Sequence, residues 1–457
     1  MNVLVMATMV IVMTAAYLAQ SKLLPAPVKF LPELMSAVLA AAVFFLGTRQ
    51  HFRYVAPKYW LVALAMIAVV IFGILANGVG SGPILSGARY YFRAAPMFLL
   101  PAVVLFSGIQ LRQQGILLVL LALLQIPLAI SQRWTLVDEG RFTGDYVYGT
   151  LMISGVMTVF LIAVICVLAA FTFRNRLRVW QFVVLSLAFM LAIAVNETKV
   201  TLLLLPIGLL VTVWHASVPA KRARHLGISL AVLTLLGAVF IPIYDHYSKL
   251  NNPYGQTLGE FFTEEGALER YLRTDAGIGS DKEAGRVDAI VEPLNALSKD
   301  PIHLVLGLGI GNASNSNIGV NFRGEYFGVY GRYTITSTVA TLILETGLLG
   351  LAIVVLFNAM LFRDAQVVAR SGNTPEADFA AGWVGVIAVM TLGLGYLTLH
   401  VFDSLSYLYM YFSGLIAATR MRMLADRREG APSTQPAGVA SRLRSAAPAR
   451  TAGALRS

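Results

Sequence analysis

The chain has 457 residues, of which 57% are hydrophobic and only 13% are charged, and its mean hydropathy is +0.71. This composition is too apolar and too poor in charge for an ordinary water-soluble globular protein, so a soluble cytosolic enzyme is excluded. The single cysteine, Cys166, lies in an apolar run. It therefore has no partner for an internal disulfide, and we expect it to be a core residue rather than part of a thiol-based or zinc site.

Apolar runs predict an all-α polytopic membrane protein with about twelve transmembrane helices, each needing about 20 residues. No positive residue precedes the first run, which favours an uncleaved helix over a signal peptide. The fourth run is short and the last two are nearly fused. The predicted spans are roughly 3–20, 31–48, 59–76, 95–109, 114–131, 150–172, 180–196, 200–216, 226–244, 336–360, 380–398 and 402–419.

Basic residues orient these spans. The turns after even-numbered spans carry clusters such as FRNRLR and KRAR, and further arginines follow the last span, whereas the opposite short loops carry few cations. Because Lys and Arg concentrate in cytoplasmic loops, both termini are predicted to be cytoplasmic. The net charge of +11 then follows from topology, and it is no evidence for a nucleic-acid partner.

One long connection separates the ninth and tenth spans. It carries half of the chain's 24 carboxylates and is predicted to be an external helical domain. Its stretches QTLGEFFTEEGALERYL and DKEAGRVDAIVEPLNALSKD both have helical patterns. The tail after the last span lacks aromatic residues and apolar periodicity, which is typical of disorder. The predicted organisation is therefore 1–244 (nine spans), 245–335 (extracytoplasmic domain), 336–420 (three spans) and 421–457 (disordered basic cytoplasmic tail).

Several other features have a structural interpretation. The motif GLGIG has Asn312 where a dinucleotide-binding loop needs its third glycine, so it is predicted to be a turn at the membrane surface. The six histidines are scattered, and no metal site or cofactor is expected. Glu345 falls inside the tenth span, where we expect a structural hydrogen bond to a neighbouring helix. The stretch YFGVYGRY either stacks on sugar rings or forms an interfacial belt, and the sequence leaves both interpretations open.

Cations at the outer ends of spans are the candidate binding residues. Arg141 precedes the sixth span, Arg89 and Arg93 precede the fourth, and Arg286 lies on an external helix. Lys199 lies in a four-residue turn at the start of a helix, a position that favours anions. Any one of these cations alone could be a snorkelling interfacial residue. If they meet in one outward-opening cleft, they can hold a diphosphate through charge-assisted hydrogen bonds.

The order of these features resembles the bacterial O-antigen polymerase and ligase superfamily, whose members act on undecaprenyl-diphosphate-linked sugars. RFTGDY is similar to an Arg-containing stretch before a middle span of that family. RVDAIVEPLNALSKDPIHLVLGLGIGNAS is similar to an external Arg followed by a helix, a Pro and Gly-x-Gly, and TSTVATLILETGLLGLAIVVLF is similar to the block that begins the next span. The resemblance covers residues 84–357.

Two positions depart from the family pattern. Lys199 replaces an arginine at the start of the eighth span, which keeps the charge but loses the bidentate fork. Ser337 and Thr338 replace the His-Asn pair of the family. That histidine is tied to transfer in ligase-type members, so its replacement favours a polymerase, or a divergent member whose base lies elsewhere.

The resemblance implies an inverting glycosyltransferase of the bacterial inner membrane that polymerises undecaprenyl-diphosphate-linked oligosaccharide units at the outer face. Lys199 and Arg286, supported by Arg141, would stabilise the departing diphosphate. A general base would take the proton of the acceptor hydroxyl. The candidates for that base, which the sequence does not separate, are Asp288, Glu292, Glu325 and His400.

Two alternative functions remain. An O-antigen ligase or O-oligosaccharyltransferase of the same superfamily would use the same donor. A secondary transporter or flippase fits the twelve predicted spans, although the long connection is external and few ionisable residues lie at mid-membrane depth. The expected partners are the lipid-linked oligosaccharide and membrane lipids, with a chain-length regulator as a further candidate and no nucleic acid.

Overall fold

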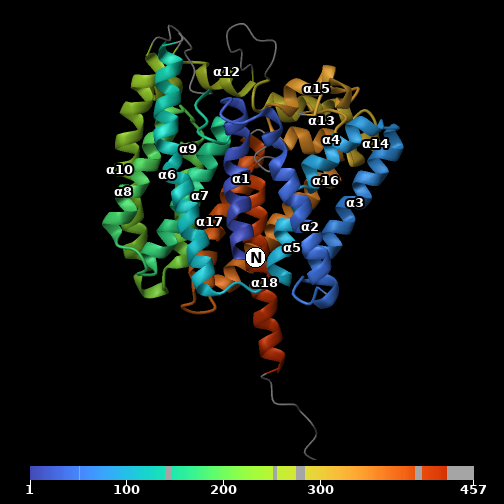
Figure 1. The fold of residues 1–457 in the computed structure, drawn as a ribbon. Helices are drawn as coiled ribbons and strands as arrows, with labels where there is room; N and C mark the ends of the chain where they lie inside the picture. The colour runs from blue at the N-terminus through green and yellow to red at the C-terminus, as the bar shows by residue number, and fades with distance from the viewer. Residues whose placement is uncertain are drawn as a thin grey trace, which may run out of the picture.

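The fold is helical throughout the part of the chain that can be described (Figure 1). The computed structural model describes residues 1–50, 52–138, 146–250, 255–273, 284–316, 318–396 and 404–429. Within these ranges the chain forms helices joined by turns and contains no strand. The predicted all-α class is therefore confirmed.

Eight helices in the described ranges are long and apolar enough to cross a bilayer. They are α1 (Asn2–Gln20), α2 (Leu31–Gln50), α3 (Pro57–Asn77), α6 (Gly108–Asp138), α7 (Ser154–Phe173), α10 (Arg222–Lys249), α16 (Thr338–Ala369) and α17 (Pro375–Tyr396). Two further apolar helices, α8 (Val179–Val195) and α9 (Thr201–Ala216), have 17 and 16 residues, and α18 spans Ser404–Glu429. These helices support a polytopic membrane protein, while the predicted count of twelve spans is not confirmed.

The fourth predicted span differs most from the structure. Its residues form α5 (Ala95–Val103), which follows α4 (Ser81–Phe92) after a break. At about 1.5 Å per residue, nine residues are too short to cross an apolar layer of about 30 Å. The break has a sequence cause, because Pro96 in the first turn of α5 cannot continue a helix from α4. The predicted span 95–109 thus begins where α5 begins, but the helix ends at Val103, and α4 precedes it as a separate short helix (Figure 1).

Helices α7 and α17 form the centre of the bundle. Nearly all side chains of α7 are buried, and α17 packs against α7, α9 and α16. Small residues allow this close packing, because a Cβ atom added to Gly385 would lie 2.4 Å from the carbonyl oxygen of Gly208. Cys166 is fully buried in α7, as expected for a core residue.

Charged side chains from distant parts of the chain pair at one end of the bundle. Lys58 Nζ lies 2.7 Å from Asp364 Oδ1, and Asp378 lies 3.2 Å from Arg174 and 2.7 Å from Arg176. All five residues are predicted to lie on the same, cytoplasmic side of the membrane. Figure 1 shows the N-terminus and the far end of α18 away from the end that carries α12, α13 and α15. The segments predicted to share a side therefore do meet in space.

The long connection folds into short helices. They are α11 (Leu258–Thr263), α12 (Ala267–Arg273), α13 (Asp288–Leu297), α14 (Pro301–Leu306), the 3-10 helix η4 (Val320–Phe322) and α15 (Phe327–Thr334). The first predicted external helix is thus two helices, interrupted before Gly266, whose φ of +77° is not helical. The second predicted external helix begins only at Asp288.

The glycine motif 307–311 forms the predicted turn, but the turn is buried and not at the surface. Gly307, Gly309 and Gly311 have φ values of +72°, +88° and +72°, which residues with a Cβ atom rarely adopt. The turn packs against α3, α4 and α16, and a Cβ atom on Gly311 would lie 2.0 Å from the carbonyl oxygen of Pro83. The burial of the turn was not predicted because sequence pattern does not report which helices cover a turn, and its position at the membrane surface stays a prediction.

Gly311→Ala should destabilise the protein, since the left-handed backbone alone costs about 1–2 kcal/mol with a side chain and the clash with Pro83 adds to it. The matched control is Gly227→Ala in α10, where an added Cβ atom meets no heavy atom within 4 Å. This control should be neutral or stabilising by up to about 1 kcal/mol. Thermal unfolding of the purified protein in detergent measures both, and equal melting temperatures for the two variants would contradict the assignment.

Candidate functional site

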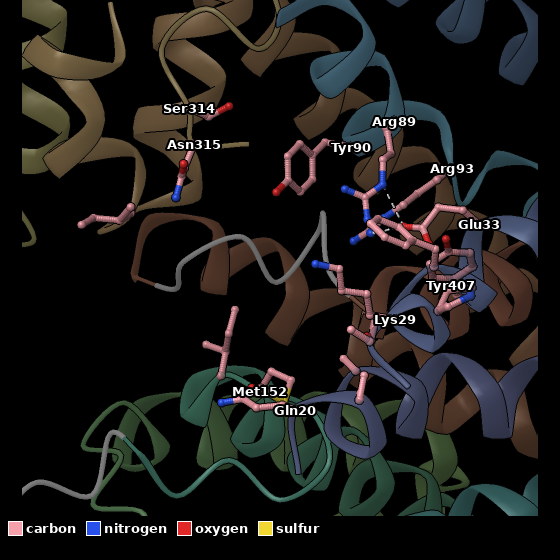
Figure 2. A pocket seen from close by; sticks show the side chains of 18 of the residues that line it. Gln20, Lys29, Glu33, Arg89, Tyr90, Arg93, Met152, Ser314, Asn315 and Tyr407 are labelled. Carbon is pink, nitrogen blue, oxygen red and sulfur yellow. Dashed lines mark hydrogen bonds and ion pairs between the residues drawn. The ribbon is translucent and has the colours of Figure 1, made fainter. Parts of the chain in front are cut away.

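A cavity of about 650 Å³ lies near the end of the bundle that carries the short helices. This polar cavity, shown in Figure 2, collects side chains from α1, α2, α4, α18 and the 3-10 helix η1 (Ala26–Phe30), together with three connecting segments. Its volume falls within the range of about 300–1,000 Å³ typical of ligand sites. The residues that line it are Ala16, Ala19, Gln20, Ala26, Lys29, Phe30, Pro32, Glu33, Arg89, Tyr90, Arg93, Met152, Ile153, Ser314, Asn315, Thr334, Ile335, Ser404 and Tyr407.

One wall of the polar cavity carries an excess of positive charge. Arg89 and Arg93 are four residues apart on α4 and therefore share one helix face. Both bind the same carboxylate oxygen of Glu33, at 2.5 Å from Arg89 Nη2 and 3.2 Å from Arg93 Nη1. Lys29 lines the same cavity. Three cations and one carboxylate favour an anionic ligand.

Aromatic rings fix the two arginines. The guanidinium carbon of Arg93 lies 5.6 Å from the ring centres of both Tyr90 and Tyr407. That of Arg89 lies 5.8 Å from Tyr90 and 5.7 Å from Phe30. Such cation–π contacts contribute roughly 0.5–2 kcal/mol each, more when desolvated. The arginines are thus held in place before any ligand arrives.

Arg89 retains unused donor capacity. Its Nη1 atom is buried and makes no hydrogen bond with any residue of the described ranges. A buried donor without a partner costs about 1–3 kcal/mol, which an anionic oxygen placed in the cavity would recover. Only 15% of the Arg89 side chain is exposed, so a bond to a phosphate oxygen would be weakly screened.

The opposite wall is polar but neutral. It includes Gln20 at the end of α1 and Ser314 and Asn315 after the glycine turn. Asn315 Oδ1 accepts hydrogen bonds from Ser316 N at 2.9 Å and from Arg323 Nε at 2.8 Å. These bonds fix the orientation of the Asn315 amide.

Glu345 anchors this neutral wall. Its side chain is buried in α16, and its Oε1 accepts a hydrogen bond of 3.0 Å from Ser314 N. The expected structural hydrogen bond to a neighbouring helix is confirmed, because the Glu345 carboxyl also hydrogen-bonds the side chain of Tyr91 on α4. The bond to the backbone of the connecting loop adds a partner that was not predicted.

Lys199 and Arg286 meet at a separate group of aromatic residues. Lys199 Nζ lies 4.3 Å from the ring centre of Phe261 and 4.9 Å from that of Tyr271. The Arg286 guanidinium lies 5.1 Å from the ring of Tyr396, and the rings of Tyr271 and Tyr396 are 6.2 Å apart. These five residues form the tyrosine cluster, which brings together two cations that are 87 positions apart in the sequence.

The tyrosine cluster and the polar cavity adjoin through one short segment. Arg286 Nη1 donates a hydrogen bond of 2.7 Å to the carbonyl oxygen of Thr336, which directly follows Thr334 and Ile335 in the cavity wall. Neither Lys199 nor Arg286 lines the cavity itself. The structure thus places Arg89 and Arg93 on one carboxylate and links Lys199 to Arg286 through the rings of Tyr271 and Tyr396, while a single pocket for all four stays a prediction.

Of the remaining predicted site residues, Arg141 and His400 lie outside the described residues. Asp288, Glu292 and Glu325 are described and do not line the cavity. Asp288 begins α13, and Glu325 is exposed before α15. The carboxylate of Glu292 accepts a hydrogen bond from the Tyr333 hydroxyl, and burial together with this bond raises the pKa of Tyr333.

Of the cavity residues, only Arg89 and Arg93 were predicted as site residues, and Lys29, Glu33 and Tyr407 show why the others were missed. Lys29 and Glu33 precede or begin an apolar run, where charged residues are usually interfacial anchors. Their spacing of four residues was the only available signal. Tyr407 lies within the stretch SLSYLYMYF and gave no signal at all, because its contact with Arg93 joins segments more than 300 residues apart.

Comparison with known proteins adds no assignment, because no family model matches the chain and no curated protein is significantly similar to it. Among the described residues, no group of three His, Cys, Asp or Glu side chains could hold a metal ion. The arrangement of charge around the polar cavity is therefore the main structural guide to function.

Replacing Glu345 tests the anchor of the neutral wall. Glu345→Ala should lower stability by about 1–3 kcal/mol, because it leaves the buried Ser314 N–H without an acceptor. Glu345→Gln retains an amide oxygen that can accept the hydrogen bond, and it should lose clearly less stability than Glu345→Ala. Thermal unfolding in detergent compares the two variants, and an Ala variant as stable as the wild type would show that the bond has no structural role.

Proposed function

We propose that this protein polymerises undecaprenyl-diphosphate-linked oligosaccharide units at the outer face of the bacterial cytoplasmic membrane. The observation that carries the proposal is the polar cavity, where Arg89 and Arg93 share a single carboxylate and Lys29 lines the same space. Helix α4, which lines the cavity, lies away from the N-terminus and the far end of α18 in Figure 1, and the distribution of basic residues predicts that end of the bundle to be external.

The surroundings of the cavity suit a lipid-linked anion. Next to Lys29 in the sequence, the connection between α1 and α2 exposes Leu23 and Leu24, and the start of α2 exposes Leu34, at 67%, 42% and 59%. Exposed apolar residues beside a cationic site can contact lipid while the cations bind a head group. A diphosphate attached to a long isoprenoid matches both surfaces, because its charged part can enter the cavity while its tail stays in the bilayer.

The reaction is a single displacement at the anomeric carbon. A hydroxyl of one lipid-linked unit forms a bond to this carbon as the bond from the carbon to the diphosphate oxygen breaks, with inversion. The bonding electron pair leaves with undecaprenyl diphosphate, and the hydroxyl proton passes to a general base. Fixed cations stabilise the negative charge that develops on the leaving group. The base contributes typically about 10² to 10⁴ in rate, and its candidates remain Asp288, Glu292, Glu325 and His400.

Two groups of cations are consistent with two lipid-linked substrates. A polymerase must hold a donor chain and an acceptor unit, and each carries its own diphosphate. The polar cavity offers Arg89 and Arg93, and the adjoining tyrosine cluster offers Lys199 and Arg286. This arrangement supports a polymerase over an enzyme that binds a single lipid diphosphate.

The position of the ligase histidine also supports a polymerase over a ligase. Ser337 occupies that position, is fully buried, and donates a hydrogen bond of 3.1 Å to the carbonyl oxygen of Gly395. A buried hydroxyl engaged in this way is not a suitable base for an acceptor. A ligase or O-oligosaccharyltransferase of this family would need its base elsewhere.

Removing single cations tests the proposal. Arg89→Ala, Lys199→Ala and Arg286→Ala should each lower the polymerisation rate by about 10² or more, since each removes a cation that holds one of the two lipid diphosphates, either the leaving group of the donor or the anchor of the acceptor. The measurement is polymer length and amount in a strain whose own copy of this gene is deleted, followed by the rate with a purified lipid-linked donor. Western blotting of membranes confirms equal protein levels.

Lys249→Ala is the matched control. Lys249 is half exposed, and its bond to Glu260 is the main cause that lowers the pKa of that surface carboxyl to about 2. Its removal should leave polymer unchanged. Wild-type chain length in the Arg89 and Lys199 variants would overturn the proposal, and lipid transfer across vesicles without polymer formation would indicate a flippase instead.

A further inference from the structure

We propose that the neutral wall of the polar cavity binds the sugar ring attached to the diphosphate, with Asn315 and Gln20 as the residues that determine its identity. This inference rests on the proposed function and adds a specificity subsite to it. It follows from the separation of the two kinds of polar residue inside one cavity.

The charged and the neutral residues lie apart around the cavity. Figure 2 shows Glu33, Arg89 and Arg93 together on one side, Asn315 with Ser314 on the opposite side, and Gln20 beside Met152 along a further edge of the open space. The cavity of about 650 Å³ also exceeds what a diphosphate alone would fill. The part of the ligand that reaches the far wall must therefore be uncharged and polar.

A sugar ring has this chemistry, because each hydroxyl both donates and accepts a hydrogen bond. Asn315 has its oxygen engaged by Ser316 N and Arg323 Nε, so its NH₂ group is the part that can donate to a ligand. Gln20 donates through Nε2 to the Tyr148 hydroxyl at 3.3 Å, so its carbonyl oxygen is the part that can accept. Together the two amides offer one donor and one acceptor to a hydroxylated ring.

The orientation of Asn315 is fixed before a ligand binds. Glu345 holds the preceding residue by its backbone, and Arg323 holds the amide oxygen. A site built to hydrogen-bond a hydroxyl discriminates against a sugar that lacks it, because the polar group of the protein is then left unpaired. The half-buried Asn315 amide, fixed across the cavity from the cations, can therefore select the first sugar of the repeat unit.

The test compares binding of two kinds of probe to the purified protein in lipid nanodiscs. One probe is undecaprenyl diphosphate, and the other is a panel of undecaprenyl-diphosphate-linked monosaccharides that covers common hexoses and N-acetylhexosamines. The wild type should bind at least one monosaccharide probe more tightly than the bare diphosphate. Asn315→Ala should reduce that preference about tenfold and leave binding of the bare probe within twofold.

Three further variants complete the design. Gln20→Ala, on a different element, should show the same selective loss, so the test does not depend on the folding of one variant. Arg89→Ala should weaken the binding of both kinds of probe. Asn295→Ala, an exposed asparagine on α13 that does not line the cavity, should change neither.

Each outcome separates the subsite from the proposed function. The sugar subsite would be overturned if Asn315→Ala lost binding of both kinds of probe. It would also be overturned if Asn315→Ala and Gln20→Ala both kept the wild-type preference for the monosaccharide probe. A wild type that binds the bare diphosphate and prefers no sugar would overturn the subsite while leaving the proposed function in place. A wild type that binds neither kind of probe would overturn the proposed function itself.

Discussion

The proposed site depends on one carboxylate that holds two arginines side by side. Without Glu33, the guanidinium groups of Arg89 and Arg93 would repel each other at the end of α4, in surroundings where charge is poorly screened. Burying such ions costs several kcal/mol each, and their mutual attraction often does no more than offset it. The ion pairs of Glu33 with Arg89 and Arg93 are therefore better explained by the way they position the two arginines than by a contribution to stability. It joins α2 to α4 and leaves the excess positive charge facing the cavity.

A second carboxylate organises the opposite wall. Glu345 lies inside a predicted membrane span, where an ionisable group is costly and usually has a function. Its hydrogen bond to Ser314 fixes the loop that presents Asn315, and the glycine turn before this loop packs so closely on α3 and α4 that side chains would not fit. One carboxylate thus arranges cations and the other arranges neutral donors. The cavity acquires its two chemically different walls from these two residues.

Composition and apolar run length were sufficient to predict the helical class and the positions of most long helices, because both depend on local sequence. The early end of α5 was missed, since the apolar run continues to Phe106 while the backbone becomes extended at Val104. The burial of the glycine turn and the loop partner of Glu345 were also missed, because each depends on which distant segments pack together.

The candidate site shows the same division between local and distant information. The pair Arg89 and Arg93 was predicted from its place beside a span, and it does line the cavity. Lys29 and Glu33 look like interfacial anchors in the sequence, and their role emerges only when α2 and α4 meet. The aromatic residues before α16 can still either stack on sugar rings or form an interfacial belt. The ring of Tyr330 contacts those of Tyr326 and Tyr333, and none of the three lines the cavity.

The choice between lysine and arginine follows the partners that each cation meets. Arg89 and Arg93 face carboxylate oxygens, for which the planar fork of arginine is suited. Lys199 lies over the rings of Phe261 and Tyr271, where a compact ammonium group is attracted by the ring faces and needs no fork. A lysine at position 199 is therefore consistent with its aromatic surroundings, and the contacts from Lys199 to Tyr271, from Tyr271 to Tyr396 and from Tyr396 to Arg286 connect its positive charge to that of the second cation.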